Sequence, residues 1–499
     1  MATEPAAVYG GRNRLLRNIG SNYAAAGAQA AFLVLATPYV IDRLGVATFG
    51  GWAVILAVTG YLRLLDLGLG PATARFVAAA RSRDEINTTV STAIVTLAGA
   101  AVLALAAAGL AILLVPSLLP EVDGLATALA YAAIATALQI PLGAFGHVLF
   151  GLERIFERNA VLLARVLLSA LALLVAVESG GGLAAFVGAI AATELLVVLG
   201  QALWCLARID GLQVRPRFAT RAALRTMIPF SGSMFAIGVA TQIAVYSSGL
   251  VVAAAMGATA VAVYTVAVRA VDAAILLLAQ FSDVFLPVFA RLQRDDDTSS
   301  AAVLLHLGTR LALVVGYPLL ALLIGLGGPL VEVWVGDGFG DTWAPLALLA
   351  ASLAFAVPLR FGVLWTIGAG RQGRIAAIAL IDSVVNIAAA IALVGPLGLE
   401  GVALAAIGAL WISNGVIMPR LIYAAAGARL WDDFYRPVLI AIAALAPFVL
   451  AMRLLVSPGL ETAPVTLLSA AIWMIVGPAL LAALLINGDD RRRLRALAG

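Results

Sequence analysis

The sequence predicts an all-α protein that crosses a membrane many times. Of its 499 residues, 63% are hydrophobic and only 12% are charged, whereas soluble globular chains carry about 45–50% apolar and about 25% charged residues. The mean hydropathy is +1.06. The apolar residues gather in fourteen stretches, most of them about 20 residues long, the length that a helix needs to span a bilayer. These observations exclude a soluble enzyme, a disordered chain and a secreted disulfide scaffold.

The fourteen predicted spans follow one another with short connections. In order, they are 19–41, 49–67, 90–114, 126–149, 160–177, 183–206, 227–255, 261–289, 309–326, 345–368, 375–394, 402–422, 437–455 and 465–486. The first stretch is longer than the apolar part of a signal peptide, and a second span follows at once. We therefore interpret it as a membrane helix rather than a cleaved leader.

Arginines gather in alternate loops. The tail before the first span carries Arg12, Arg14 and Arg17, and basic loops follow the even-numbered spans. The opposite loops are short and mostly acidic, with Arg43 and Arg453 as exceptions. Because basic loops stay on the cytoplasmic side, the pattern predicts a multi-pass membrane protein with both termini in the cytoplasm.

The longest segment between spans divides the chain. The predicted parts are an N-terminal lobe with helices 1–6 (1–206), a cytoplasmic linker (207–226), a C-terminal lobe with helices 7–12 (227–422), and two extra helices with a basic tail (423–499). Within the linker, Arg217, Arg221 and Arg225 recur every four residues. That spacing predicts a basic stripe on a helix that lies along the membrane surface.

Two short motifs recur at a similar offset. Gly45–Trp52 resembles Gly257–Tyr264, and Pro71–Phe76 resembles Pro287–Leu292. Six spans separate the copies, so both copies would start from the same side of the membrane. This repeat predicts two pseudo-symmetric six-helix lobes, followed by the two extra helices.

Polar side chains recur on single faces of several predicted spans. In span 8, Arg269 and Asp272 can pair along one face, and Gln280 and Asp283 continue that face. Such groups are costly in lipid, so they indicate a hydrated cavity between the lobes. Hydrogen bonding between packed helices is the alternative. With Arg269 and Asp272, the predicted substrate-binding residues are Asn22, Gln29, Gln242 and Tyr246.

Other charges in the spans have simpler interpretations. Arg360 and Asp382 lie at a similar depth, which predicts a structural ion pair between neighbouring helices. Arg165 is close enough to the inner surface to reach it, and His147 is expected at the membrane interface. Glu194 has no obvious partner at its level, so a protonated core acid and a proton-coupling site both stay open.

The residue inventory argues against an enzyme or a metalloprotein. The chain has one cysteine, two histidines and no lysine, so all 31 basic residues are arginines. This leaves no material for a disulfide, a thiol metal cluster or a Schiff base. We expect no metal, no cofactor and no nucleic-acid partner, and coupling to H⁺ or Na⁺ stays open.

The second span and its exit carry a recognisable motif. The runs Phe49-Gly-Gly-Trp52, Gly60-Tyr-Leu-Arg-Leu-Leu-Asp-Leu-Gly-Leu-Gly70 and Ala74-Arg-Phe76 follow Pro38-Tyr-Val-Ile-Asp-Arg-Leu-Gly45. Together they resemble the N-terminal signature of bacterial polysaccharide flippases. These are the O-antigen and exopolysaccharide unit translocases of the multidrug/oligosaccharidyl-lipid/polysaccharide exporter superfamily.

The resemblance implies a function in the biosynthesis of cell-surface polysaccharides such as lipopolysaccharide or exopolysaccharide. Such proteins move polyprenyl-diphosphate-linked oligosaccharides from the cytoplasmic to the outer leaflet by alternating access. It implies that Arg63, Asp66 and Arg75 act at the inner gate, to which Asp283 is also assigned, and that Arg269 and Asp272 lie in the cavity. The implied partners are the lipid-linked oligosaccharide, membrane lipids and glycan polymerase machinery.

Three alternatives remain. A cation-coupled multidrug antiporter of the same superfamily would typically have twelve helices and use carboxylates for cations. A lipid II flippase also has fourteen helices, but the signature fits polysaccharide flippases better. A membrane glycan polymerase or ligase would carry a large outer loop with catalytic residues, and the outer loops here are short.

Overall fold

The computed structural model describes residues 12–283, 298–336, 338–368, 372–457, 462–490 and 492. Throughout this part the chain is helical, and the described residues contain no β-strand. The all-α expectation is therefore confirmed. The chain divides into two compact units, Met1–Gln242 and Ile243–Gly499.

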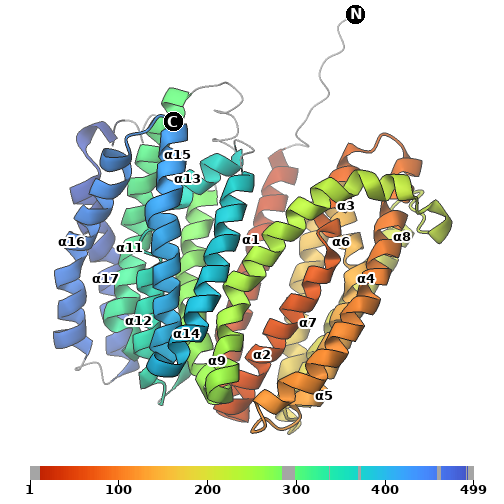
Figure 1. Cartoon of the computed structure of the whole chain (residues 1–499), viewed down its shortest axis with the longest axis horizontal. Helices are drawn as coiled ribbons and strands as arrows, with labels where there is room; N and C mark the ends of the chain where they lie inside the picture. Colours follow the sequence, from red (N-terminus) through yellow and green to blue (C-terminus); the bar gives the residue numbers. More distant parts are fainter. Residues whose placement is uncertain are drawn as a thin grey trace, which may run out of the picture. The chain divides into compact units, whose positions relative to one another are not determined.

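The first unit packs long apolar helices side by side (Figure 1). Its helices are α1 (Arg12–Leu44), α2 (Val46–Arg63), α3 (Leu69–Ala79), α4 (Arg83–Leu118), α5 (Leu125–Leu142), α6 (Ala144–Gly151), α7 (Ile155–Glu178), α8 (Leu183–Arg208) and the first part of α9 (Arg221–Asp283). A 3-10 turn, Leu64–Asp66, joins α2 to α3. Another 3-10 turn, Pro216–Phe218, precedes α9.

Among the described residues, the second unit contains the rest of α9 and seven further α-helices, which are labelled in Figure 1. These are α11 (Thr298–Val335), α12 (Trp343–Ser352), α13 (Ala356–Gly368), α14 (Gln372–Ile412), α16 (Arg436–Ala451) and α17 (Ala463–Leu485), with the short α15 (Met418–Ala425) between α14 and α16. Short π-helical turns, Ser413–Ile417, Trp431–Tyr435 and Met452–Val456, continue α14 and flank α16.

Among the described residues, ten helices are long and apolar enough to cross a membrane, or eleven with the bent pair α12–α13. Two of the ten contain a break where the backbone leaves the helical region, at Gly257 (φ 81°) in α9 and at Gly398 (φ 59°) in α14. Each break separates two predicted spans. The prediction of about fourteen spans therefore fits approximately, and the chain is a multi-pass membrane protein.

The backbone matches at one position of the predicted repeat. Gly45, which precedes α2, has φ 88° and ψ 162°, and its counterpart Gly257 has φ 81° and ψ −178°. Residues with a side chain rarely adopt such a backbone conformation, so glycine is favoured in both copies. The second repeated motif begins at Pro287 and lies outside the described residues. The two-lobe symmetry and the predicted domain boundaries stay predictions.

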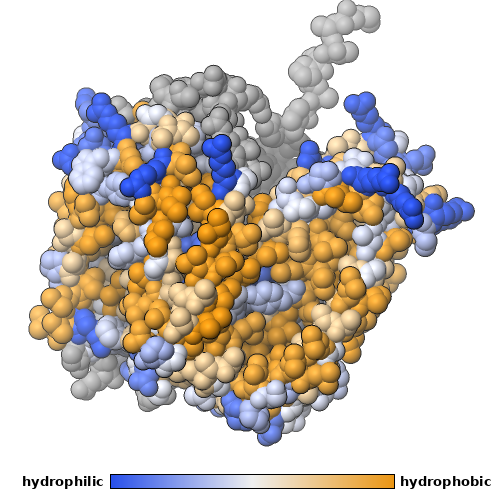
Figure 2. All heavy atoms as spheres, in the orientation of Figure 1, coloured by the Kyte–Doolittle hydropathy of each residue, from blue (hydrophilic) through white to orange (hydrophobic). Residues whose placement is uncertain are grey.

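The surface of the helices suits a lipid solvent. Large apolar side chains are exposed along their flanks, as shown by Leu113 and Leu455, which are 77% and 78% exposed. Figure 2 shows hydrophobic side chains over the visible flanks of the helices and hydrophilic ones gathered toward their ends. In contrast, small residues such as Ala93, Ala104 and Ala137 are buried where helices pack closely.

Side chains of α4 hold the segment between α8 and α9. The Asn87 amide donates to the Gly211 carbonyl at 3.0 Å and accepts from the Gln213 N–H at 2.9 Å. Further along, Ser91 and Thr92 accept backbone N–H bonds from residues 215 and 220. These three side chains of α4 are buried, so their bonds are shielded from water. The segment is therefore pinned to α4 over ten residues.

This arrangement corrects the predicted arginine stripe. Arg217 lies in the 3-10 turn, and the helix that carries Arg221 and Arg225 begins only at Arg221. Residues 219 and 220 between them are not helical. The four-residue spacing therefore failed as a helical signal because Pro216 and the bonds to α4 favour an extended chain here.

In the second unit, α11 packs against α16 and α17. A charge network joins them at one end. Arg310 Nη1 lies 2.6 Å from Asp490 Oδ2 and donates to the Leu485 carbonyl at 2.8 Å. His306 lies between two carboxylates, 2.6 Å from Asp433 and 3.4 Å from Asp490. The network ties α11 to the start of α16 and to the end of α17.

Candidate functional site: a cationic pocket in the first unit

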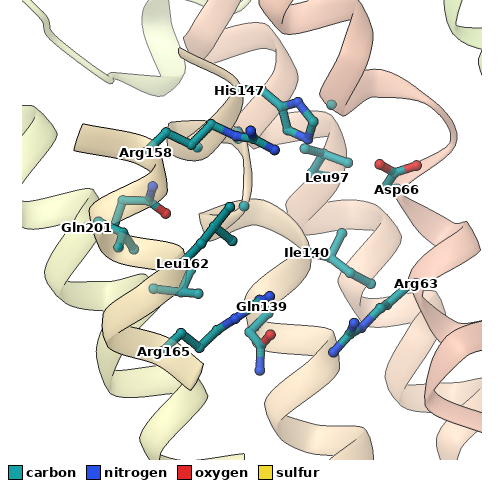
Figure 3. Close-up of a pocket in the computed structure, with 16 residues that line it drawn as sticks. Arg63, Asp66, Leu97, Gln139, Ile140, His147, Arg158, Leu162, Arg165 and Gln201 are labelled. Atoms are coloured by element: carbon teal, nitrogen blue, oxygen red, sulfur yellow. The ribbon is translucent and has the colours of Figure 1, made fainter. Parts of the chain in front are cut away.

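The first unit encloses a pocket of about 300 Å³ between α2, α5, α6, α7 and α8. Apolar side chains such as Ile140 and Leu162 form part of its wall. Its charged and polar lining residues are Arg63, Asp66, Gln139, His147, Arg158, Arg165 and Gln201 (Figure 3). All of these come from helices within one unit.

Helix α7 supplies two arginines to the pocket. Arg158 and Arg165 are seven residues apart, which places them on one face of the helix, two turns from each other. The Arg158 guanidinium lies over the Phe150 ring, 5.4 Å from its centroid. Within the described part of the chain, neither arginine has a carboxylate within 4.0 Å. Both charges therefore enter the pocket without a counter-ion from these residues.

The third arginine comes from the opposite wall. Arg63 ends α2, and its Nη2 lies 3.5 Å from Glu194 Oε2 on α8. In Figure 3, Arg63 and Arg165 extend from opposite sides toward Gln139. The pairing corrects the expectation that Glu194 has no partner at its level.

Asp66 closes the turn that follows Arg63. Its Oδ1 accepts the Gly68 N–H at 2.7 Å. The turn requires left-handed backbone at Leu67 (φ 54°) and Gly68 (φ 71°). Gly68 also touches α9, because a Cβ there would lie 2.3 Å from the Ser231 carbonyl oxygen. Asp66 thus holds the start of α3 in place beside the pocket.

Glycines let the walls approach each other. A Cβ on Gly70 would lie 2.4 Å from Nε2 of His147, and a Cβ on Gly146 would contact the Gln201 amide at 3.5 Å. The imidazole of His147 therefore packs directly against the backbone of α3. The structure places it in the pocket wall, whereas the sequence suggested the membrane interface.

The charges of the pocket favour an anion. Three arginines face it, and among the described residues only Arg63 has a carboxylate partner. An uncompensated charge inside an apolar helical bundle is costly, so a bound anion would stabilise the site. Arginine forms paired, charge-assisted hydrogen bonds with phosphate oxygens, and the amides of Gln139 and Gln201 can donate further bonds. The pocket can therefore bind a phosphorylated group.

Of the predicted gate residues, Arg63 and Asp66 meet at this pocket. Arg75 lies outside its lining and stacks on Phe230 of α9, with its guanidinium carbon 4.6 Å from the ring centroid. The side chain of Asp283, assigned to the same gate, lies outside the described residues. The gate role of all four stays a prediction.

The predicted substrate-binding residues lie elsewhere. Gln29 is exposed on α1, Gln242 and Tyr246 are half-buried on α9, and the Asn22 side chain is outside the described residues. Arg269 is half-buried one turn before Asp272 on α9. Their role in a central cavity stays a prediction.

Asp272 and Asp382 line a second cavity of about 240 Å³ within the second unit, together with Asn386. The predicted partner of Asp382, Arg360, donates from Nε to the Ser282 hydroxyl at 3.1 Å. The ion pair between Arg360 and Asp382 stays a prediction.

Sequence reasoning missed Arg158 and Arg165 as a pair. Arg158 lies between the predicted spans 126–149 and 160–177, in one of the basic loops, and the position of Arg165 suggests that it reaches the membrane surface. The signal was their spacing of seven, which puts both on one helical face. Glu194 and Gln201 repeat this spacing on α8 and could have been found in the same way.

A match to a protein-family model shows the family of this chain. Residues 43–347 match the model of a family described as "Polysaccharide biosynthesis protein". The chain belongs to this family. A curated relative, the uncharacterized membrane protein EpsK of Bacillus subtilis (strain 168), is 25% identical over 413 residues, which are 77% of this chain and 78% of the relative.

Solved structures share the fold of this family member. An inward-facing MATE multidrug resistance transporter of the MOP superfamily matches with a TM-score of 0.69 and 16% identity, over 80% of this chain and 95% of the transporter. The lipid II flippase MurJ, inward closed, matches with a TM-score of 0.68 and 15% identity, over 95% and 100%. The predicted membership in a polysaccharide family is confirmed by the family model, and the two solved structures show that the chain shares their fold.

Proposed function

We propose that this protein translocates polyprenyl-diphosphate-linked oligosaccharides from the cytoplasmic to the outer leaflet, for the biosynthesis of cell-surface polysaccharide. The observation that carries the proposal is the pair Arg158 and Arg165. Both line a pocket inside a membrane bundle, and neither has a carboxylate partner among the described residues. A diphosphate supplies the missing negative charge, and the family supports a glycan attached to it.

The chemistry of the pocket favours this substrate over the main alternative. A multidrug antiporter carries organic cations, which three inward-facing arginines would repel. A diphosphate can instead accept hydrogen bonds from two guanidinium groups at once. In the proposal, alternating access exposes the substrate first to one side of the membrane and then to the other. Its coupling ion and its glycan polymerase partner are left as expectations.

The test is a transbilayer assay in liposomes. Purified protein is reconstituted with a fluorescent polyprenyl-diphosphate oligosaccharide, and a membrane-impermeant quencher reports which leaflet holds the probe. We expect protein-dependent exchange that falls by at least about tenfold in Arg158→Gln and Arg165→Gln, because each loses a charged hydrogen bond of about 1.5–3 kcal/mol.

The matched control is Arg154→Gln. Arg154 precedes α7 and pairs with Glu157 at 3.1 Å, outside the lining of the pocket. We expect its exchange rate to equal that of the wild type. Unchanged exchange in the two pocket variants would refute the role of the pocket. Movement of organic cations without movement of the glycolipid would favour the antiporter. Arg269→Ala, in the same assay, tests the predicted central cavity.

A further inference from the structure

Glu194 on α8 pairs with Arg63 of the pocket lining, although no role follows for it from the proposed function. Val198 and Gln201, which line the pocket, lie four and seven residues after it, so all three share one helical face. Its carboxylate approaches Arg63 at 3.5 Å. The Glu194 side chain is 23% exposed and that of Arg63 is 55% exposed. The pair therefore sits at the edge of the pocket, with the guanidinium side more open.

The charges around the pocket indicate a role for the pair of Arg63 and Glu194. Three arginines and Asp66 line the pocket, and Glu194 adds a second carboxylate through its pair with Arg63. The Asp66 carboxylate accepts the Gly68 N–H. With both carboxylates ionised, the site carries one net positive charge from these five groups. Without the charge of Glu194, the site would carry two net positive charges. These would balance the two negative charges of a diphosphate diester.

We infer that Glu194 is an internal counter-ion. It pairs with Arg63 while the pocket is empty, and the anionic substrate displaces it. The inference rests on the proposed function of the pocket. Because Glu194 and the substrate compete for the same guanidinium group, the carboxylate lowers the affinity for the anion. It also speeds release, since Arg63 regains a partner when the substrate leaves. Glu194 is thus a positioning residue that tunes binding against release.

Glu194→Gln tests the inference, because it removes the charge and keeps the size of the side chain. Inorganic pyrophosphate is the binding probe, measured by calorimetry on the purified full-length protein in nanodiscs. We expect binding on the order of tenfold tighter than in the wild type, the effect of one nearby charge at partial burial. In liposomes, the exchange should saturate at lower glycolipid concentration and reach a lower maximal rate. A purely structural glutamate predicts weaker binding, the opposite sign.

Three further variants make the result specific. Glu157→Gln breaks the ion pair with Arg154 outside the pocket and should leave pyrophosphate binding unchanged. Glu194→Asp keeps the charge on a shorter side chain and should give an intermediate affinity. In an Arg63→Gln background, Glu194→Gln should lose most of its effect, because the two residues act as a pair.

The outcomes separate the two proposals. If the wild type binds pyrophosphate and Glu194→Gln binds equally or more weakly, the inference is overturned and the pocket keeps its proposed function. An undiminished effect of Glu194→Gln in the Arg63→Gln background would likewise overturn it. If neither the wild type nor Glu194→Gln binds pyrophosphate, the anion site itself fails, and the inference fails with it.

Discussion

Replacing Asp490 by alanine should strongly destabilise the second unit. The carboxylate is 3% exposed and lies 2.6 Å from Arg310, whose side chain is 17% exposed. It also accepts the Asn487 N–H at 3.1 Å. The substitution leaves the partly buried Arg310 guanidinium with the Leu485 carbonyl as its one remaining hydrogen-bond partner among the described residues. Breaking a buried ion pair in this way costs about 3–5 kcal/mol.

The neighbouring residue provides the control. Asp489 pairs with Arg492, but both side chains are largely exposed, at 68% and 79%. Exposed pairs contribute at most about 1 kcal/mol, so Asp489→Ala should unfold almost as the wild type does. The measurement is the free energy of unfolding in mixed detergent micelles with increasing SDS, followed by circular dichroism. A loss below about 1 kcal/mol in Asp490→Ala would refute the reasoning.

Three further substitutions test the packing. Gly68→Ala places a Cβ 2.3 Å from the Ser231 carbonyl oxygen in left-handed backbone, so we expect a loss of about 2–4 kcal/mol in the same unfolding assay. Gly99→Ala, with open space around the site, should instead stabilise α4 slightly; equal effects would contradict the analysis. Trp473→Phe removes the indole N–H that donates to the Pro318 carbonyl at 2.8 Å and should cost about 1–3 kcal/mol. An unchanged free energy would show that this bond is replaceable.

The membrane helices could be predicted because each one carries its own signal. About 20 apolar residues identify a span regardless of its neighbours, and the breaks at Gly257 and Gly398 fall between predicted spans. Gly45 and Gly257 hold the same position in the repeated motif, and both have a positive φ in the structure. Local chemistry decided all of these features.

The pocket could be predicted only in part, because packing between distant segments creates it. Arg63 and Glu194 are more than one hundred residues apart in the chain, and no pattern in either helix says that they meet. His147 and Arg165 lie near the ends of the predicted spans 126–149 and 160–177, so their sequence context suggested the membrane surface. In the structure, Arg165 lies in the middle of α7. Only the packing of α5, α6, α7 and α8 turns these side chains toward one cavity.

The segment fastened to α4 by Asn87, Ser91 and Thr92 behaves unlike an ordinary connection. Surface loops usually tolerate insertions, because no fixed contact depends on the number of their residues. Here the backbone N–H groups of residues 213, 215 and 220 each bond to a fixed side-chain oxygen on α4. One added residue would therefore shift every later N–H group away from its acceptor. A change in the length of this segment, in evolution or by engineering, would therefore need a compensating change in the positions of the acceptors on α4.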